Sequence, residues 1–506
     1  MNENIRIIEN GTVVTCDSQR RMGAFTILIK GDRVAEVSNR GDMLKSVYPN
    51  AEVIDARGKL IVPGFVDAHC HGESALLRHF TALKPLAQWS KNEEVKRAFE
   101  YIYQQADVQD LSVVYRLAYF SALKSGVTSI AEFCFDNLDR PLVAAFEAMK
   151  RADLRGVIGL HNGDQIERAR RLIHPSIRFA VVLPSEEDLT TYNLQTTVRL
   201  ASDLKLPLII HSGETKRGLE NIRRNFQRST VKLLYEHRLF ESSILAVHFA
   251  ALEPGDVDVL ANVNARVILT PRSVFLKGTD HPSVTELLQR NISVVLASDW
   301  GVADPFENIR AFVSIAAGQG IDNLHGEELV RMVTCEAAKA LGIHDSVGSL
   351  ETNKKADLTF IDCSSPRFAG LAHREPASAL ASTISEATYR DVSDVMINGE
   401  FFVREHHVMT YSEEDLAKES AELMNRIHQY VVAQKVARVP SISKLEEAPK
   451  TFDDGEMQGD VEGFRIMPKT FVKLSPDQKI IPMPVETHKK TELPNKVKKV
   501  FGDDDL

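Results

Sequence analysis

A few histidine and carboxylate side chains in this sequence have the types and spacing that bind a divalent metal ion. His69 and His71 are two residues apart, and in an extended chain residues with this spacing project to the same side, so both imidazoles can reach one cation. His211, His248 and Asp299 each lie at the end of a short apolar run. Imidazole and carboxylate ligands without a thiolate suit zinc, with Fe²⁺ or Mn²⁺ as alternatives. The sequence therefore predicts one divalent metal ion, with zinc as the first choice.

These side chains need parallel strands to bring them together, and the central part of the chain predicts eight. Most of the eight are continuous apolar runs typical of strands buried on both faces, and helix-length segments separate most of them. No GxGxxG follows any of them, which argues against a dinucleotide-binding fold. The pattern predicts an α/β protein with a (β/α)8 TIM barrel, in which the carboxyl ends of the strands carry the active site. The predicted strands are 65–69, 127–133, 156–161, 179–183, 208–211, 245–249, 266–269 and 293–298, and the clearest helices are 111–124, 142–152, 191–204 and 219–239.

The two ends of the chain have a different sequence pattern from the central part. Short β-rich runs with turn residues occupy residues 1–62 and return in 344–411, which suggests one small, β-sandwich-like domain built from both flanks of a barrel at 63–343. A C-terminal helix is predicted in 412–439. Residues 440–506 are rich in proline and charge, so we expect an extended or partly disordered tail.

Composition narrows the class of protein. The 61 Lys and Arg residues nearly balance 70 Asp and Glu, for a net charge of −9, which argues against nucleic acid or an anionic membrane as a partner. No apolar run approaches the roughly 18 residues that span a bilayer, and the polar N-terminus does not resemble a secretory signal. The five cysteines form no CxxC, as expected for reduced thiols in a cytoplasmic protein.

Several motifs resemble those of a known superfamily. VPGFVDAHCH at 62–71 resembles the opening motif of the amidohydrolase superfamily, and Leu76-Leu77-Arg78 with Trp89 resembles a loop of its cytosine deaminase and chlorohydrolase (ATZ/TRZ) branch. GVTS at 126–129 and GSLETNKKADL at 348–358 also match. The resemblance spans about 5–403, and the superfamily's split β domain supports the pairing of the two flanks.

The resemblance implies a role for each candidate residue. Glu214, three residues after His211, matches the HxxE proton shuttle. His248 would polarise the substrate or hydrogen-bond the metal-bound water, and Asp299 would also receive the water's proton. Relatives with two metals use a lysine at the end of strand four, but that strand here ends in Leu183-Pro184, so one metal is favoured. The implied ligands are His69, His71, His211 and Asp299.

Residues at the expected pocket edge depart from the branch pattern. A Pro-x-Ser-Asn motif is common after strand seven, whereas this chain has Pro271-Arg272-Ser273-Val274. Arg272 fits either a structural salt bridge or a contact with an anionic group or carbonyl edge of the substrate. Substrate contacts are predicted at Arg78, Arg272, Ser273 and Trp300.

The expected chemistry is metal-assisted hydrolysis of a small molecule. A divalent cation lowers the pKa of bound water from about 15.7 towards roughly 7 and so supplies hydroxide at neutral pH. The first hypothesis is deamination of an amino-substituted nitrogen heterocycle. The alternatives are hydrolysis of a cyclic amide, alkylamine or C–Cl bond at the same site, or a non-catalytic scaffold. A homodimer is compatible with either enzyme hypothesis.

Overall fold

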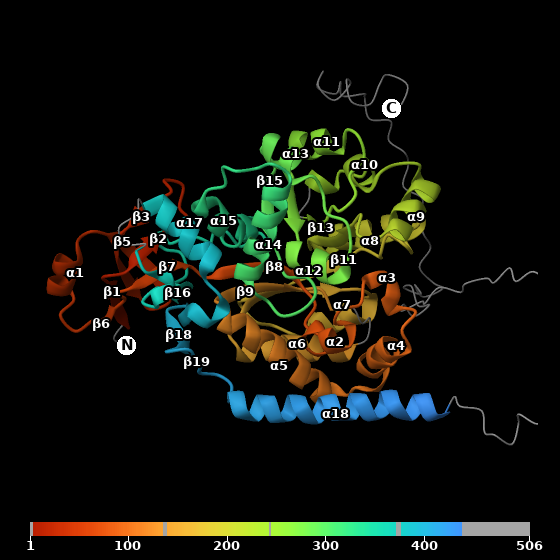
Figure 1. Cartoon of the computed structure of the whole chain (residues 1–506), viewed down its shortest axis with the longest axis horizontal. Coiled ribbons are helices and arrows are strands. Elements are labelled where there is room, and N and C mark those ends of the chain that lie inside the picture. Colours follow the sequence, from red (N-terminus) through yellow and green to blue (C-terminus); the bar gives the residue numbers. More distant parts are fainter. Residues whose placement is uncertain (1–3, 135–138, 242–243, 371–375, 438–506) are drawn as a thin grey trace, which may run out of the picture.

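The computed structural model of the chain describes residues 4–134, 139–241, 244–370 and 376–437. Its centre is an eight-stranded parallel sheet in which the strands follow one another in chain order (Figure 1). Each of the eight predicted strands overlaps one of these, so the predicted barrel strands are confirmed. They are β8 (Phe65–Cys70), β9 (Val127–Glu132), β10 (Arg155–Leu160), β11 (Ile177–Val182), β12 (Leu208–Ser212), β13 (Ile244–His248), β14 (Arg266–Leu269) and β15 (Ser293–Leu296).

The first and last strands of this sheet meet at the residues that follow β15. Cys70 and Asp299 form a parallel bridge, the Asp299 N–H donates to the His69 carbonyl at 2.9 Å, and the His71 N–H donates to the Asp299 carbonyl at 3.1 Å. The Ser298 N–H also donates to the buried Asp67 carboxylate at 2.9 Å. These contacts bring the sheet close to a complete barrel, and they do so at its carboxyl end.

Helices cover the outside of the barrel, and one prediction about them is wrong. The segment 219–239 is two helices, α9 (Lys216–Phe226) and α10 (Thr230–Glu236), rather than one. Gln227 ends the first with a left-handed backbone (φ 54°), and the Ser229 side chain caps the second by accepting a hydrogen bond from the Lys232 N–H. The other three predicted helices correspond to α5 (Val108–Lys124), α6 (Asp139–Arg151) and α8 (Thr191–Leu204).

The remaining helical elements connect strands or lie beside the barrel. The α-helices are α1 (Gly41–Val47), α2 (Ser74–Thr81), α3 (Leu86–Trp89), α4 (Glu93–Glu100), α7 (Gly163–Ala169), α11 (Asp256–Asn262), α12 (Pro271–Lys277), α13 (Val284–Gln289), α14 (Pro305–Gly318), α15 (Gly326–Met332), α16 (Cys335–Ala340) and α17 (Pro376–Glu386). Shorter 3-10 or π segments are η1 (Tyr101–Gln105), η2 (Leu239–Glu241), η3 (Pro366–Phe368) and η5 (Tyr389–Asp391).

Two further sheets are formed by the flanks of the barrel, and the larger one combines strands from both flanks. The seven-stranded sheet has the order β19-β18-β17-β16-β7-β2-β3, and its β7–β16 contact is antiparallel, with Ile61 opposite Phe360. The four-stranded sheet has the order β5-β4-β1-β6, and an apolar cluster that includes Ile27, Phe360 and Met396 combines residues of the two sheets. The early and late flanks therefore pair, while the domain limits 1–62, 63–343 and 344–411 remain a prediction.

The strands of these sheets are short. They are β1 (Ile5–Glu9), β2 (Thr12–Val14), β3 (Met22–Gly23), β4 (Thr26–Lys30), β5 (Arg33–Ser38), β6 (Glu52–Asp55), β7 (Lys59–Pro63), β16 (Leu358–Asp362), β17 (Val392–Ile397), β18 (Glu400–Arg404) and β19 (His407–Val408).

The long helix α18 (Glu413–Ala437) follows the last strand and lies along α4 and α5 (Figure 1). It buries Leu423 and Ile427 in the main core. None of the helices in the described part of the chain is long and apolar enough to cross a membrane. The tail predicted at 440–506 lies outside the described residues.

Candidate functional site

The predicted metal ligands and catalytic residues lie together at the carboxyl end of the barrel. His69 belongs to β8 and His71 follows it, His211 belongs to β12, His248 ends β13, and Asp299 follows β15. Three groups have ligand atoms that all lie within 4.8 Å of one another: His69, His71 and His211; His69, His248 and Asp299; and His211, Glu214 and His248.

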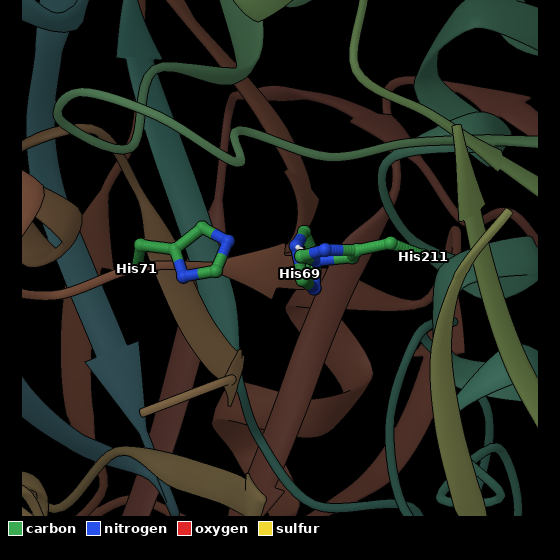
Figure 2. A group of neighbouring side chains, drawn as sticks. All are labelled: His69, His71 and His211. Carbon is green, nitrogen blue, oxygen red and sulfur yellow. Dashed lines mark hydrogen bonds between the residues drawn. The ribbon is translucent and has the colours of Figure 1, made fainter. Parts of the chain in front are cut away.

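The donor atoms converge as they would around one cation. The His69 and His211 Nε2 atoms are 3.0 Å apart, and Asp299 Oδ1 lies 3.1 Å from His71 Nε2 and 3.6 Å from His69 Nε2. The rings of His69, His71 and His211 lie close together (Figure 2), with centroid separations of 4.8, 4.9 and 5.5 Å. Asp299 Oδ1 is fully buried and, among the described residues, forms no hydrogen bond. Buried nitrogen and oxygen donors with this arrangement fit a divalent metal ion such as zinc.

Burial adjusts the protonation of these donors. It lowers the pKa of His69 to about 3 and the pKa of His211 well below its ordinary value, so both rings are neutral, as metal binding requires. Burial alone would raise the pKa of Asp299, but Lys277 and the neighbouring imidazoles hold it well below its usual range. His71 differs, because Asp299 and Glu73 outweigh the effect of burial and raise its pKa to about 9. Metal binding at this ring would therefore displace a proton.

The backbone at two of these positions is in the left-handed region. Asp299 has φ 52° and His248 has φ 79°, conformations that non-glycine residues rarely adopt. The two hydrogen bonds that close the barrel hold Asp299, and the His248 Nδ1 atom lies 3.1 Å from Thr270 Oγ1. Such local strain persists where the surrounding structure enforces it, and it often accompanies functional positions.

Glu214 lies in the loop between β12 and α9, directed into the site. Its Oε2 atom is 3.7 Å from His211 Nδ1 and 3.6 Å from His248 Nε2. The preceding residue, Gly213, has φ +68°, and its N–H donates to both carboxylate oxygens of buried Glu186 at 2.9 Å. This turn aims the Glu214 carboxylate at the two histidines.

One residue of the site, Lys277, is not among the candidates predicted from the sequence. It is the last residue of α12, it is only 5% exposed, and its Nζ atom lies 2.6 Å from both Glu214 Oε1 and Asp299 Oδ2. The one signal in the sequence was that Lys277 follows predicted strand seven, whose carboxyl end borders the predicted site. The spacing within the sequence gives no sign of these two contacts.

The four predicted substrate contacts lie around the site and have partners within the protein. Ser273 donates to Asp299 Oδ2 at 2.5 Å, and Arg272 forms an ion pair with Glu307. Trp300 is buried, stacks on Phe99 with ring centroids 5.7 Å apart, and donates its Nε1–H to Thr81. Arg78 donates to the Ala75 carbonyl, and burial lowers its pKa. Their contacts with substrate remain predictions.

The sequence is similar to one protein family and to relatives that share one name. The sequence profile of the amidohydrolase family matches residues 60–402. A 5-methylthioadenosine/S-adenosylhomocysteine deaminase from Pelotomaculum thermopropionicum is 29% identical over 440 residues, covering 82% of this chain and 96% of the relative. Its counterpart from Pyrococcus furiosus is 25% identical over 432 residues, covering 81% and 98%.

Solved structures share the fold. A zinc-bound adenosine deaminase from Xanthomonas campestris has a TM-score of 0.75 at 20% identity, covering 84% of this chain and 98% of that one. The zinc-bound atrazine chlorohydrolase TrzN of Arthrobacter aurescens has a TM-score of 0.70 at 18% identity, covering 83% and 100%. Since the family profile matches well over half of the sequence, this chain belongs to the amidohydrolase family, as its opening motif predicted.

Proposed function

We propose that this enzyme is a zinc-dependent deaminase that hydrolyses the exocyclic C–N bond of an amino-substituted nitrogen heterocycle. One observation carries the proposal: Glu214 lies between His211 and His248, beside a convergent set of imidazole and carboxylate donors. The relatives named as 5-methylthioadenosine/S-adenosylhomocysteine deaminases make aminopurine nucleosides the first substrate class to test.

Four side chains would hold the metal: His69, His71, His211 and Asp299. When bound, a divalent ion would supply a water molecule of low pKa, and hence a nucleophile at neutral pH. Because strand β11 is followed by Leu183-Pro184 rather than a lysine, the donor set suits a single ion.

The other residues would move protons and orient the substrate. Asp299 would accept the proton released as water adds to the ring carbon, and Glu214 would pass a proton to a ring nitrogen or to the departing nitrogen. One water is consumed, the C–N bond breaks, and ammonia leaves. His248, whose ring is held beside Thr270, would hydrogen-bond the substrate through Nε2, a buried atom that forms no hydrogen bond within the described chain.

The test is a metal analysis of the purified protein combined with a product screen. We expect about one zinc per chain and ammonia release from at least one compound in a panel of aminopurines and their nucleosides, aminopyrimidines, pterins and triazines. Release of an alkylamine or halide instead would assign the same site to the other hydrolase chemistry predicted from the sequence. A protein without bound metal and without any product would contradict the proposal.

The free cysteines bear on the compartment in which the enzyme works. Cys16, Cys70, Cys134, Cys335 and Cys363 are all free thiols, which suits a cytoplasmic enzyme. Light scattering on the purified protein would test whether it forms the homodimer that the resemblance allows.

A further inference from the structure

Lys277 places a cation between two carboxylates of the site. Its Nζ atom is 2.6 Å from Glu214 Oε1 and 2.6 Å from Asp299 Oδ2, and its side chain is 6% exposed. The lysine comes from α12, whereas Glu214 follows β12 and Asp299 follows β15. One ammonium group therefore joins three separate parts of the barrel rim.

In each carboxylate, one oxygen contacts Lys277 and the other is directed at histidine nitrogens. Asp299 Oδ2 accepts hydrogen bonds from Lys277 and from Ser273 Oγ, at 2.6 and 2.5 Å, which leaves Oδ1 directed at the His69 and His71 nitrogens. Glu214 Oε1 accepts from Lys277, which leaves Oε2 beside His211 and His248. In each carboxylate, the oxygen that does not contact Lys277 is the one directed at the histidines of the site.

We infer that Lys277 is a positioning residue: it orients Asp299 Oδ1 towards the metal and Glu214 Oε2 towards the substrate. This inference rests on the proposed metal-dependent function. Hydrogen-bond partners of ligating carboxylates fix the orientation of the ligand, and their loss commonly lowers metal affinity or activity by about 10–100-fold. Without the ammonium group, two buried carboxylates would also face each other without a shared counter-charge.

The inference opposes a simpler electrostatic interpretation. A cation next to Asp299 repels a second cation, so a lysine that acted only through its charge would weaken metal binding, and its removal would strengthen it. If the lysine acts by positioning, its removal should weaken metal binding, because Asp299 would lose the orientation that the lysine enforces. The sign of the change in metal affinity therefore separates the two interpretations.

The test compares Lys277→Met with the wild type and with a matched control. The control is Lys59→Met, which removes another lysine–carboxylate pair, with Asp394, located in the seven-stranded sheet. Zinc affinity is measured by competition with a chelator, and kcat and KM are measured with the substrate found in the product screen. We expect Lys277→Met to lose about 10–100-fold in zinc affinity or in kcat, with KM nearly unchanged and no gain in affinity. Lys277→Arg should recover part of the loss, and Lys59→Met should match the wild type in zinc affinity, kcat and KM.

Two results would overturn the inference. One is Lys277→Met protein that binds zinc more tightly than the wild type, and the other is a variant with unchanged zinc affinity and unchanged kcat. If Lys277→Met does not fold, Lys277→Gln replaces it, since the shorter, uncharged amide keeps a hydrogen-bond donor but does not hold both carboxylates as the ammonium group does. That variant should show a loss in the same direction, and an unchanged affinity and kcat would again overturn the inference. A wild-type protein that binds no zinc would instead refute the proposed function.

Discussion

Glu214 is the residue at which metal binding and chemistry can be separated. Its side chain is only 12% exposed and lies close to His211 and His248, yet it is not one of the four proposed ligands. The structure pairs the carboxylate with Lys277, which belongs to a different element. This position suits a group that moves protons within a closed site.

Glu214→Gln should therefore abolish most activity and retain the metal. The amide preserves size and hydrogen bonding but cannot exchange a proton, so we expect kcat to fall by about 10²–10⁴-fold. Zinc content by mass spectrometry should stay near that of the wild type, while His211→Ala and Asp299→Ala should lose both zinc and activity. Near-normal turnover of a fully metallated Glu214→Gln protein would contradict the shuttle assignment.

Arg272 combines an ion pair with a position beside the site. It pairs with Glu307 and donates to the Trp300 and Val302 carbonyls at 3.4 and 3.5 Å. If it also contacts the substrate, Arg272→Ala should raise KM several-fold more than it lowers kcat, with zinc content unchanged. Glu307→Gln is the matched control, since it breaks the same ion pair and leaves the guanidinium in place. Equal kinetics of the two variants would assign Arg272 a structural role.

At the scale of elements, a buried ion pair joins the barrel to the seven-stranded sheet. Arg155, at the start of β10, contacts Asp357 at 3.1 Å and Asn398 at 2.9 Å, and the Asn398 N–H donates to Asp357 at 2.8 Å. Both charged side chains are almost fully buried, at 9% and 2% exposure. Asp357 also lies in the late motif that resembles the superfamily, so this motif residue has a structural task.

Asp357→Ala should destabilise the protein strongly without affecting the metal site. Removal of one partner leaves the Arg155 charge buried without compensation, which typically costs about 3–5 kcal/mol. Chemical denaturation should report this loss in the free energy of unfolding, and zinc content of the folded protein should be unchanged. A loss below about 1 kcal/mol would show that water or relaxation compensates Arg155.

The Lys59–Asp394 pair makes the stability of the same sheet sensitive to acid. Burial alone would raise the pKa of Asp394, but hydrogen bonds from Lys59 and Ser393 outweigh this effect and lower the pKa below its ordinary value. A carboxyl group whose pKa is lowered by folding stabilises the fold above its unfolded pKa, about 4, and this contribution is lost as pH falls through the lower folded value.

Lys59→Met should therefore differ from the wild type most at neutral pH. We expect a deficit of about 1–3 kcal/mol at pH 7 that is constant down to about pH 5 and shrinks below about pH 4. Unfolding titrations at a series of pH values measure it. A deficit that widens on acidification would contradict the assigned direction of the pKa shift.

At the scale of the whole molecule, every proposed ligand and all eight barrel strands lie between Phe65 and Asp299. Helix α18 packs on α4 and α5 (Figure 1). Deletion of residues 440–506 should leave a folded protein with full zinc content and activity. Loss of soluble expression or of bound zinc after this truncation would show that the tail contributes to the fold.

The sequence by itself predicted the barrel strands, the pairing of the flanks and the convergence of the candidate ligands. Those predictions rest on local properties: apolar runs identify buried strands, a spacing of two puts His69 and His71 on one side, and parallel strands bring their carboxyl ends together. The break between α9 and α10 was not predicted. Gln227 ends α9 in the left-handed conformation, a position that is usually occupied by glycine.

The contacts between side chains within the site depend on how the elements pack and do not follow from the sequence pattern. Lys277 is 63 residues from Glu214 and reaches it across the barrel rim, a contact that depends on the curvature of the closed sheet and on the placement of α12. The division of Asp299 between a metal-facing and a lysine-facing oxygen has the same origin, as does the closing bridge between Cys70 and Asp299. Local patterns in a sequence specify which elements form, but contacts between distant side chains are fixed only when those elements pack.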